Sequence, residues 1–565
     1  YKPMQNVHVV AGSGVGGGSL VYFNITERPE PAVYQRWPAE TIEPKLSTAK
    51  YYEYAESFIR TNSITTTTSN GNFMLLRTKA FQNAAKTINM DKNNEHCIVT
   101  RPDDTFELDA KLSITEFEPD VLFSKGGPLG LGTRVEEMSE HDLAQTFNTF
   151  LNKYKKETNV CQRQGRCGLG CIPGARHSLN KQIYKAISDG KSLDVFPLCK
   201  VDHIEYTENS DYKYRIILKD YRDFDEGVDE VINAKQLILS AGTLGSTEIL
   251  LRSKNHLELS DKLGTSFTTN GDTFGVINPT KENVDSSRGP MQTSIARFMN
   301  RKSNEFKFSI EDLGVPKMFA EILPILFNLM ALQKKAGSFI PQINLVDLVR
   351  QNILPTINKS NTRQLMSRLL AGLHISPENI TDEIAEILRK MGEFDSHEKL
   401  REQSLDERVR HIMLLFGIGL DKANGQLTIN EKNNELDLVS KYELNDDTQP
   451  IVKSITDMMK LFAKQIGKNG GDSLIIPFWD SKDNRQQITA HPLGGCAMGE
   501  DATTGVVSSF GQVFRGHAGS NVYENLYVID GSIIPSPLGV NPSLTISALA
   551  FRTSEHITRN RDYWP

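Results

Sequence analysis

The segment GSGVGGGSL at residues 12–20 constrains the fold of this chain most, because five of its nine residues are glycine. It follows the apolar run VHVVA at residues 7–11, which predicts a buried strand. Gly12, Gly14 and Gly17 satisfy the pattern G-x-G-x-x-G. A dinucleotide-binding turn needs more than this pattern: a helix must begin inside the loop, and an acidic residue must follow about 20 residues later.

The residues after the loop do not supply that context. Residues 19–26 are β-branched and aromatic, and Pro29 and Pro31 prevent a helix from continuing. No second strand ends in Asp or Glu at the required distance. The local pattern therefore favours another kind of glycine loop, whose backbone closely approaches a flat or anionic group.

Size and charge narrow the classes of protein. A chain of 565 residues predicts two or more domains, and a net charge of −6 argues against nucleic acid as the main partner. Residues are 38% hydrophobic, and no run is long enough to span a bilayer. Six cysteines in so long a chain do not make a disulfide scaffold. The compartment stays open between a soluble, cytoplasmic location and a peripheral membrane location.

Two stretches differ in organisation. Residues 193–250 have an α/β pattern, with strands expected at 193–196, 212–218 and 236–240, then a small-residue turn and a helix from residue 246. Such a turn presents backbone N–H groups to an anion, or simply lets a helix pack on a sheet. Residues 315–410 predict a helical insertion, whose apolar stretch at 319–332 suits a lid or a membrane-surface contact. Further strands are expected at 412–419, 425–429 and 526–531.

Three of the cysteines, Cys161, Cys167 and Cys171, fall within eleven residues of a glycine-rich stretch. Three thiolates so close together could surround a metal. Iron–sulfur clusters are held by cysteine thiolates, whereas zinc prefers four ligands and would need His177 as the fourth. Free structural thiols are the remaining interpretation.

The C-terminal part carries a resemblance. HPLGGCAMG at 491–499 and NLYVIDGSIIPSPLGVNPSLTISALAFRTSEHI at 525–557 resemble the C-terminal signature of the glucose–methanol–choline (GMC) flavoprotein oxidoreductases, in their cholesterol-oxidase-like branch. GSGVGGGSL is similar to the second glycine loop of that family, which lies against the flavin. LILSAGTLGSTEILL at 237–251 and TSFTTNGD at 265–272 follow in family order.

The resemblance implies an α/β (α+β) fold with two domains. An FAD-binding, Rossmann-like domain would comprise residues 1–30, 160–264 and 486–565. A β-sheet substrate domain would comprise 31–159 and 265–485, with the helical insertion inside it. Family members begin with a βαβ unit that holds the ADP half of FAD, and this chain starts after it. We expect that unit to lie upstream of Tyr1; otherwise FAD would be held in another way.

The resemblance also nominates site residues. The catalytic pair maps onto His491 and Asn541, and Glu311 is a further candidate base, with an ordinary surface carboxylate as the alternative. Asp530 is either a cap for sugar-like hydroxyls or part of an ordinary turn. The expected flavin contacts are Gly12, Gly14, Gly16, Gly17, Ser19, Val201, Gly242, Asp530, Asn541 and Pro542.

Three functions follow as hypotheses. The first is FAD-dependent oxidation of a sterol or another bulky, lipid-like alcohol. The second is a dehydrogenase of a sugar or simple alcohol that passes electrons through an iron–sulfur cluster to an acceptor protein. The three-cysteine spacing is similar to that of bacterial FAD glucose dehydrogenases, in which three cysteines bind a three-iron cluster. The third is a flavin-less structural or binding subunit.

Overall fold

The computed structural model describes residues 2–4, 7–41, 50–63, 75–99, 108–113, 161–314, 316, 410–438, 449–476 and 487–559, with short gaps at 162–164, 166, 172–173, 209 and 223–225. The predicted helical insertion, with its apolar stretch at 319–332, falls almost wholly outside these ranges.

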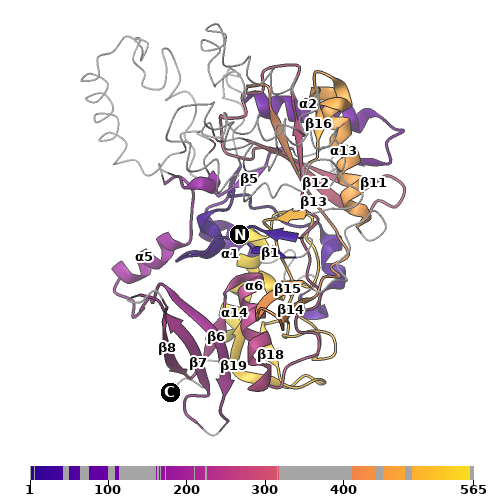
Figure 1. The fold of residues 1–565 in the computed structure, drawn as a ribbon. Helices are drawn as coiled ribbons and strands as arrows, with labels where there is room; N and C mark the ends of the chain where they lie inside the picture. Colours follow the sequence, from indigo (N-terminus) through magenta and orange to yellow (C-terminus); the bar gives the residue numbers. More distant parts are fainter. Residues whose placement is uncertain are drawn as a thin grey trace, which may run out of the picture.

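A six-stranded antiparallel sheet forms the upper part of the molecule (Figure 1). Two helices, α2 (Leu76–Met90) and α13 (Pro450–Ile466), pack on it. The α13 helix buries apolar side chains three and four positions apart, including Ile451, Ile455 and Phe462. The order of the strands across the sheet is β16 (Leu474–Ile475), β10 (Thr273–Ile277), β13 (Met413–Gly419), β12 (Phe306–Leu313), β11 (Ile295–Asn300) and β4 (His96–Ile98).

The register of this sheet decides which side chains face the helices. Ile310 pairs with Gly417, and Glu311 pairs with Phe416. A Cβ atom at Gly417 would lie 2.2 Å from Cγ2 of Ile455, so the glycine lets α13 approach the sheet. Because successive side chains in a strand alternate between faces, Glu311 points to the face opposite α13.

Two three-stranded sheets lie in the lower part (Figure 1). In the first, β9 (Leu237–Leu239) runs parallel to β19 (Val522–Val528), which pairs with β18 (Gln512–Phe514). The second is an antiparallel sheet of β6 (Cys199–Tyr206), β7 (Tyr214–Asp220) and β8 (Val228–Ala234). Around them lie α6 (Gly242–Arg252), α14 (Ser543–Arg559) and α1 (Lys50–Ile59), and α1 packs against α14.

A third small sheet joins the beginning of the chain to a late segment. Its strands are β1 (Lys2–Met4), β2 (Val7–Val9) and β17 (Gln487–Thr489), and β2 and β17 are parallel, with Val9 opposite Thr489. Chains that leave two neighbouring parallel strands emerge at the same edge of the sheet. The glycine-rich loop and the segment that contains His491 therefore begin side by side.

The remaining elements are short. They are β3 (Asn62–Ser63), β5 (Lys111–Leu112), β14 (Leu427–Asn430), β15 (Glu435–Leu438), α5 (Asn180–Ser188) and the 3-10 turns η1 (Gly17–Leu20), η2 (Pro31–Arg36), η3 (Ala39–Thr41), η5 (Cys167–Leu169), η6 (Ser253–Asn255), η12 (Gly470–Ser473) and η13 (Gly531–Ile533). Within the described ranges, no helix combines the length and the apolar character needed to cross a membrane.

The mixed α/β class and most of the expected strands are confirmed. Strands expected at 212–218, 236–240, 412–419 and 425–429 correspond to β7, β9, β13 and β14. The strand expected at 193–196 is wrong, because these residues are exposed and form no regular structure. The boundaries of the two predicted domains stay a prediction.

Candidate active site

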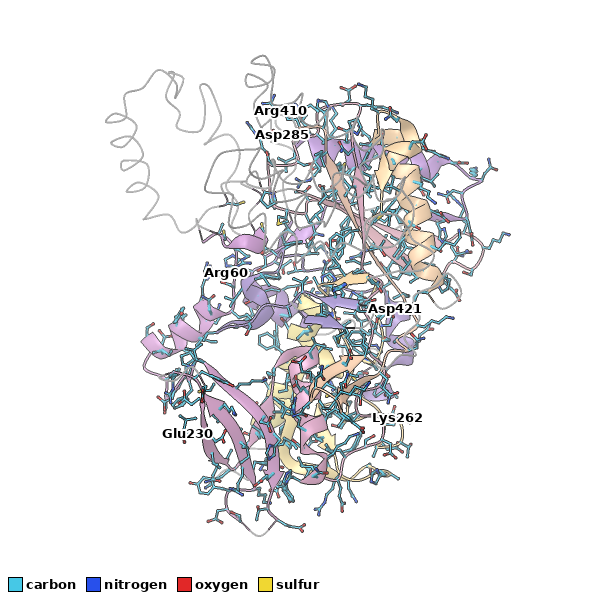
Figure 2. The ribbon with its side chains drawn as sticks, viewed as in Figure 1. Arg60, Glu230, Lys262, Asp285, Arg410 and Asp421 are labelled. Carbon is cyan, nitrogen blue, oxygen red and sulfur yellow. The ribbon has the colours of Figure 1, made fainter. Side chains whose placement is uncertain are left out.

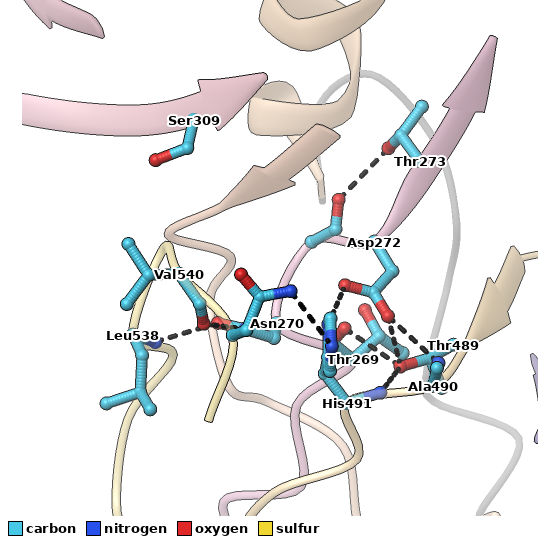
Figure 3. Close-up of polar contacts among 12 residues, drawn as sticks. Thr269, Asn270, Asp272, Thr273, Ser309, Thr489, Ala490, His491, Leu538 and Val540 are labelled. Atoms are coloured by element: carbon cyan, nitrogen blue, oxygen red, sulfur yellow. Dashed lines mark hydrogen bonds and ion pairs between the residues drawn. The ribbon is translucent and has the colours of Figure 1, made fainter. Parts of the chain in front are cut away.

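His491 follows β17 and is fixed by the carboxylate of Asp272, which directly precedes β10 (Figure 3). Nδ1 of His491 lies 2.9 Å from Oδ1 of Asp272. The other oxygen, Oδ2, accepts hydrogen bonds from the Thr489 hydroxyl and the Ala490 N–H, both at 2.9 Å. A carboxylate can only accept, so Nδ1 carries the proton and Nε2 keeps a free lone pair.

Asn541 lies beside that lone pair. Its Nδ2 atom is 3.5 Å from Nε2 of His491, although the two residues are 50 positions apart in the chain. Oδ1 of Asn541 is buried and has no hydrogen-bond partner. A buried amide oxygen without a donor is unfavourable unless something else supplies one. The structure thus brings the predicted pair together and leaves one acceptor available there.

One turn, residues 268–272, holds both members of the pair (Figure 3). Oδ1 of Asn270 accepts from the N–H groups of Leu538 and Gly539, at 2.8 and 3.0 Å, and its Nδ2 donates to the carbonyl of Val540 at 2.8 Å. Asn270 has a φ of 56°, a left-handed conformation that asparagine tolerates well. The turn therefore fixes the segment before Asn541 through Asn270, and fixes His491 through Asp272.

A second buried carboxylate, that of Asp421, also holds the turn by hydrogen bonds. Asp421, labelled in Figure 2, accepts hydrogen bonds from the Thr268 hydroxyl at 2.6 Å and from the N–H groups of Thr269 and Gly271 at 3.1 and 3.2 Å. Burial raises the pKa of Asp421, and these hydrogen bonds oppose that rise. The motif TSFTTNGD was noted in the sequence, but the positioning roles of Asn270 and Asp272 were not predicted.

Glu311 is fully buried in β12, so the alternative of a surface carboxylate is wrong. Nε2 of Gln292 donates to Oε2 of Glu311, whereas Oε1 has no hydrogen-bond partner. Burial raises the pKa of Glu311 well above its ordinary value, and the nearby carboxylate of Glu27 raises it further. The amide of Asn541 partly offsets this rise, which indicates that Glu311 lies next to the His491–Asn541 pair.

The backbone of the glycine loop has a conformation that lets another group approach it closely. Gly14 and Gly16 have φ values of 138° and 113°, which L side chains rarely adopt. Beyond them the backbone is open, because a Cβ atom at Gly17 would meet no atom within 4 Å. Ser19 closes the loop by donating to the carbonyl of Gly16 at 2.6 Å and accepting from the N–H of Leu179 at 2.8 Å.

Asp530 forms a structural link between two turns. One of its oxygens accepts from the N–H of Gly242 at 2.9 Å and from the Ser246 hydroxyl at 2.5 Å, and the other accepts twice from Ser532. These bonds satisfy the first turn of α6, which starts four residues earlier than predicted. Gly242 has a φ of 77° and open space on its Cβ side.

The other nominated contacts occupy separate positions. Val201 lies in β6, in the lower part of the molecule, and buried Pro542 directly follows Asn541. Gly12 packs closely, because a Cβ atom there would lie 2.8 Å from the Val21 side chain. The roles of all nominated residues as flavin contacts stay predictions.

Two of the three clustered cysteines, Cys167 and Cys171, lie next to the exit of the glycine loop through contacts with Arg176. The guanidinium of Arg176 donates to the carbonyls of Leu20 at 2.5 Å and of Cys167 at 2.7 Å. Cys167 is buried against Met291, and Sγ of Cys171 accepts from the N–H of Arg176 at 3.4 Å. In the part of the chain that the structure describes, the three thiols do not form a group with ligand atoms within 4.8 Å of one another. The iron–sulfur and zinc interpretations stay predictions.

Two parts of the chain match known protein families. Two family models, each described as GMC oxidoreductase, match residues 3–100 and 421–550. The class is that of FAD-dependent enzymes that oxidise alcohols. Both matches confirm the predicted resemblance to the GMC oxidoreductase family.

Individual relatives are either similar over nearly the whole chain at low identity or similar over a short part of it. A cholesterol oxidase from Mycobacterium tuberculosis is 24% identical over 98% of this chain and 79% of its own length. A long-chain-alcohol oxidase from Arabidopsis thaliana is 32% identical, over 18% of this chain and 12% of its own length. Among solved structures, the formate oxidase of Aspergillus oryzae RIB40 has a TM-score of 0.51 at 11% identity, covering 98% of this chain and 85% of that one. This last similarity concerns the fold alone.

Members of this family bind FAD, and the residues present here fit its flavin end. The open backbone faces at Gly17 and Gly242 leave room for a flat group, and Oδ1 of Asn541 is a buried acceptor without a donor. A flavin ring supplies an N–H donor and a planar surface.

Proposed function

We propose that this enzyme oxidises the hydroxyl of a sterol or another bulky, lipid-like alcohol, using His491, Asn541 and Glu311. The observation that carries the proposal is the fixed pair of His491 Nε2 and Asn541 Nδ2, 3.5 Å apart, with the buried Glu311 beside it. In the reaction, the carbinol carbon loses a hydride and the hydroxyl loses a proton. Bound FAD supplies the hydride acceptor.

His491 accepts the hydroxyl proton at Nε2. The Asp272 carboxylate holds the proton of the ring on Nδ1, at 2.9 Å, so that Nε2 presents its lone pair to the substrate hydroxyl. When Nε2 takes up the substrate proton, the same carboxylate stabilises the positive charge on the ring. Asp272 is a positioning residue in this scheme, because it acts through His491.

Asn541 orients the hydroxyl. Its amide can donate from Nδ2 to the substrate oxygen while Nε2 of His491 receives the proton of that oxygen. Glu311 is the second candidate proton-accepting group, because its buried carboxyl lies next to Asn541 on the face of the sheet toward His491. Oε1 of Glu311 has no donor and is free to exchange a proton.

Aromatic side chains near His491 support a bulky apolar substrate. The ring of Phe416 lies 5.4 Å from the His491 ring, and the ring of Phe274 lies 4.7 Å from that of Phe416. Both lie on the Glu311 face of the sheet, as the strand register indicates. Membrane contact through residues 319–332 stays a prediction, because those residues lie outside the described ranges.

The test is a substrate panel with FAD-loaded full-length protein. A sterol, a long-chain primary alcohol and a sugar are compared, each with oxygen and with a dye as acceptor. The variant His491→Ala should lose about 10²–10⁴-fold in kcat/KM. The matched control is His517→Ala, because His517 also pairs with a carboxylate, Asp261 at 3.0 Å, but on the surface.

The outcomes separate the three hypotheses. Turnover of the sterol or the long-chain alcohol that disappears in His491→Ala supports the proposal. Turnover of the sugar alone, with the dye but not with oxygen, contradicts it and favours the dehydrogenase. Full-length protein without flavin absorbance contradicts it as well and favours the flavin-less subunit.

A further inference from the structure

We propose that His203, Glu205 and His256 form a site for one divalent transition metal ion, with Zn²⁺ as the ion that the ligand set suits. Two imidazoles and a carboxylate, with a water molecule in the fourth position, are a common zinc environment. The site lies in the lower part of the molecule and uses no residue of the catalytic proposal.

Secondary structure brings the three residues together. His203 and Glu205 are two positions apart in β6 and therefore share one face of the strand. His256 directly follows η6, which packs on β6, and Ser253 of η6 accepts a hydrogen bond from the N–H of Ile204 at 2.9 Å. The rings of His203 and His256 stack with centroids 4.8 Å apart.

The three ligand atoms lie close together. Oε1 of Glu205 is 3.8 Å from Nε2 of His203 and 3.8 Å from Nδ1 of His256. All three atoms lie within 4.8 Å of one another, and within the described ranges this is the one such group of three His, Cys, Asp or Glu residues. Tetrahedral ligands at about 2.1 Å from zinc are roughly 3.4 Å apart, so each glutamate–histidine pair must close by about 0.4 Å and the histidine–histidine pair by up to about 1.4 Å.

A second observation, independent of these distances, points to a ligand. Nδ1 of His203 lies 2.8 Å from Oδ2 of Asp202, so Nδ1 carries the proton and Nε2 presents its lone pair toward Glu205. A carboxylate on the far nitrogen of a ligating histidine is the usual outer partner at metal sites. An irregularity in β6 between Val201 and His203 brings Asp202 to the same side as its neighbour.

The surrounding charges favour a cation. Arg215 pairs with the other oxygen of Glu205 at 2.5 Å, which orients Oε1 toward the histidines. Arg252 pairs with Glu248 at 2.8 Å and lies 4.0 Å from Asp202. Three carboxylates thus face two guanidiniums, which leaves one negative charge for a divalent ion to offset.

Bound metal would join β6 to the segment after α6. The competing explanation is that the two stacked imidazoles and the carboxylate form an ordinary surface contact. The two explanations differ in whether Zn²⁺ binds and whether it raises the melting temperature.

The experiment titrates Zn²⁺ into metal-free, full-length protein, and measures the stoichiometry by elemental analysis and the Kd by competition with a chelator. We expect one saturable site and a higher Tm with Zn²⁺. His256→Ala, whose side chain is partly exposed and tolerates truncation, should abolish that site and the Tm rise. Asp202→Asn should weaken binding about 10-fold, because only the outer partner is changed.

The control is again His517→Ala. His517 and Asp261 form a histidine–carboxylate pair, which offers two possible metal ligands where the proposed site has three. It should bind Zn²⁺ as the unaltered protein does. Absence of saturable binding overturns the proposal, as does equal binding by His256→Ala and His517→Ala. Neither readout uses alcohol oxidation, so this proposal and the proposed function fail separately.

Discussion

Glu311 and Asp312 are consecutive buried carboxyls in β12, and they lie in opposite environments. Asp312 faces the helices and pairs with Arg77 of α2 at 2.7 Å. It also accepts from the N–H groups of Thr293 and Ser294, at 2.7 and 2.6 Å. Glu311 faces the candidate active site, receives one hydrogen bond from Gln292, and has no partner at Oε1.

The difference separates a structural carboxyl from a reactive one. Burying a carboxylate is costly unless a cation and hydrogen bonds replace water. Asp312 has both, because Arg77 is itself fully buried and also donates to backbone carbonyls of Ser286 and Pro290. Glu311 has no paired cation among the described residues and lacks a hydrogen-bond partner at Oε1. Its pKa therefore rises, and it can exchange a proton.

The largest effect is expected from Asp312→Asn. This change leaves the buried guanidinium of Arg77 without a counter-charge and should lower the free energy of unfolding by about 3–5 kcal/mol. Urea unfolding measures it. The double variant Arg77→Met with Asp312→Asn removes both charges and keeps an acceptor for the N–H groups of Thr293 and Ser294, so it should recover part of that loss. Equal destabilisation in both variants would show that packing, and not the charge pair, matters at this position.

The isosteric change at the neighbouring residue, Glu311→Gln, should lower kcat and leave the free energy of unfolding nearly unchanged. An amide cannot accept the proton, so kcat should fall about 10²-fold, which corresponds to about 2.7 kcal/mol. The free energy of unfolding should change by no more than about 1 kcal/mol, because the glutamine amide has nearly the same shape and can still accept the hydrogen bond of Gln292. Unchanged kcat together with a loss of stability like that of Asp312→Asn would remove the distinction between the two carboxyls.

The smallest effect is a pH dependence. The pKa of Glu311 is raised above 4.5, so the folded protein holds a proton that the unfolded chain releases above that pH. The stabilisation from this proton is complete below pH 4.5 and is lost as pH rises through the raised pKa. The native protein should therefore lose stability relative to Glu311→Gln as pH rises from 4.5 through the raised pKa of Glu311.

Urea unfolding of both proteins across this range measures the difference. The pKa values of Asp421 and Asp530 are also raised by burial, but both proteins share these groups, so their effects cancel in the difference. A difference that does not change with pH would contradict the assignment of the raised pKa to Glu311.

Sequence reasoning found the motifs but few of their partners. His491 and Asn541 were predicted because each lies within a motif, and the structure brings them to 3.5 Å. Asp272 was missed as the partner of His491 because the contact spans 219 residues of the chain. The same reason hides Arg77 and Asp312, which are 235 residues apart.

Local propensity failed where tertiary contacts decide the structure. Residues 193–196 have strand-forming side chains but no neighbouring strand, and they remain exposed. The start of α6 was placed at residue 246, whereas Asp530 satisfies the N–H of Gly242 and lets the helix begin there. No local pattern indicates a cap that lies 288 residues away.

The turn at residues 268–272 has a consequence for how this enzyme could change. Because Asn270 holds the segment before Asn541 and Asp272 holds His491, a shift of this turn carries both side chains with it. Their separation is then preserved while their position relative to a bound alcohol changes. Substrate preference could therefore be altered by substitutions that reposition this turn, or by substitutions on the strand face around Glu311, without taking the proton-accepting pair apart.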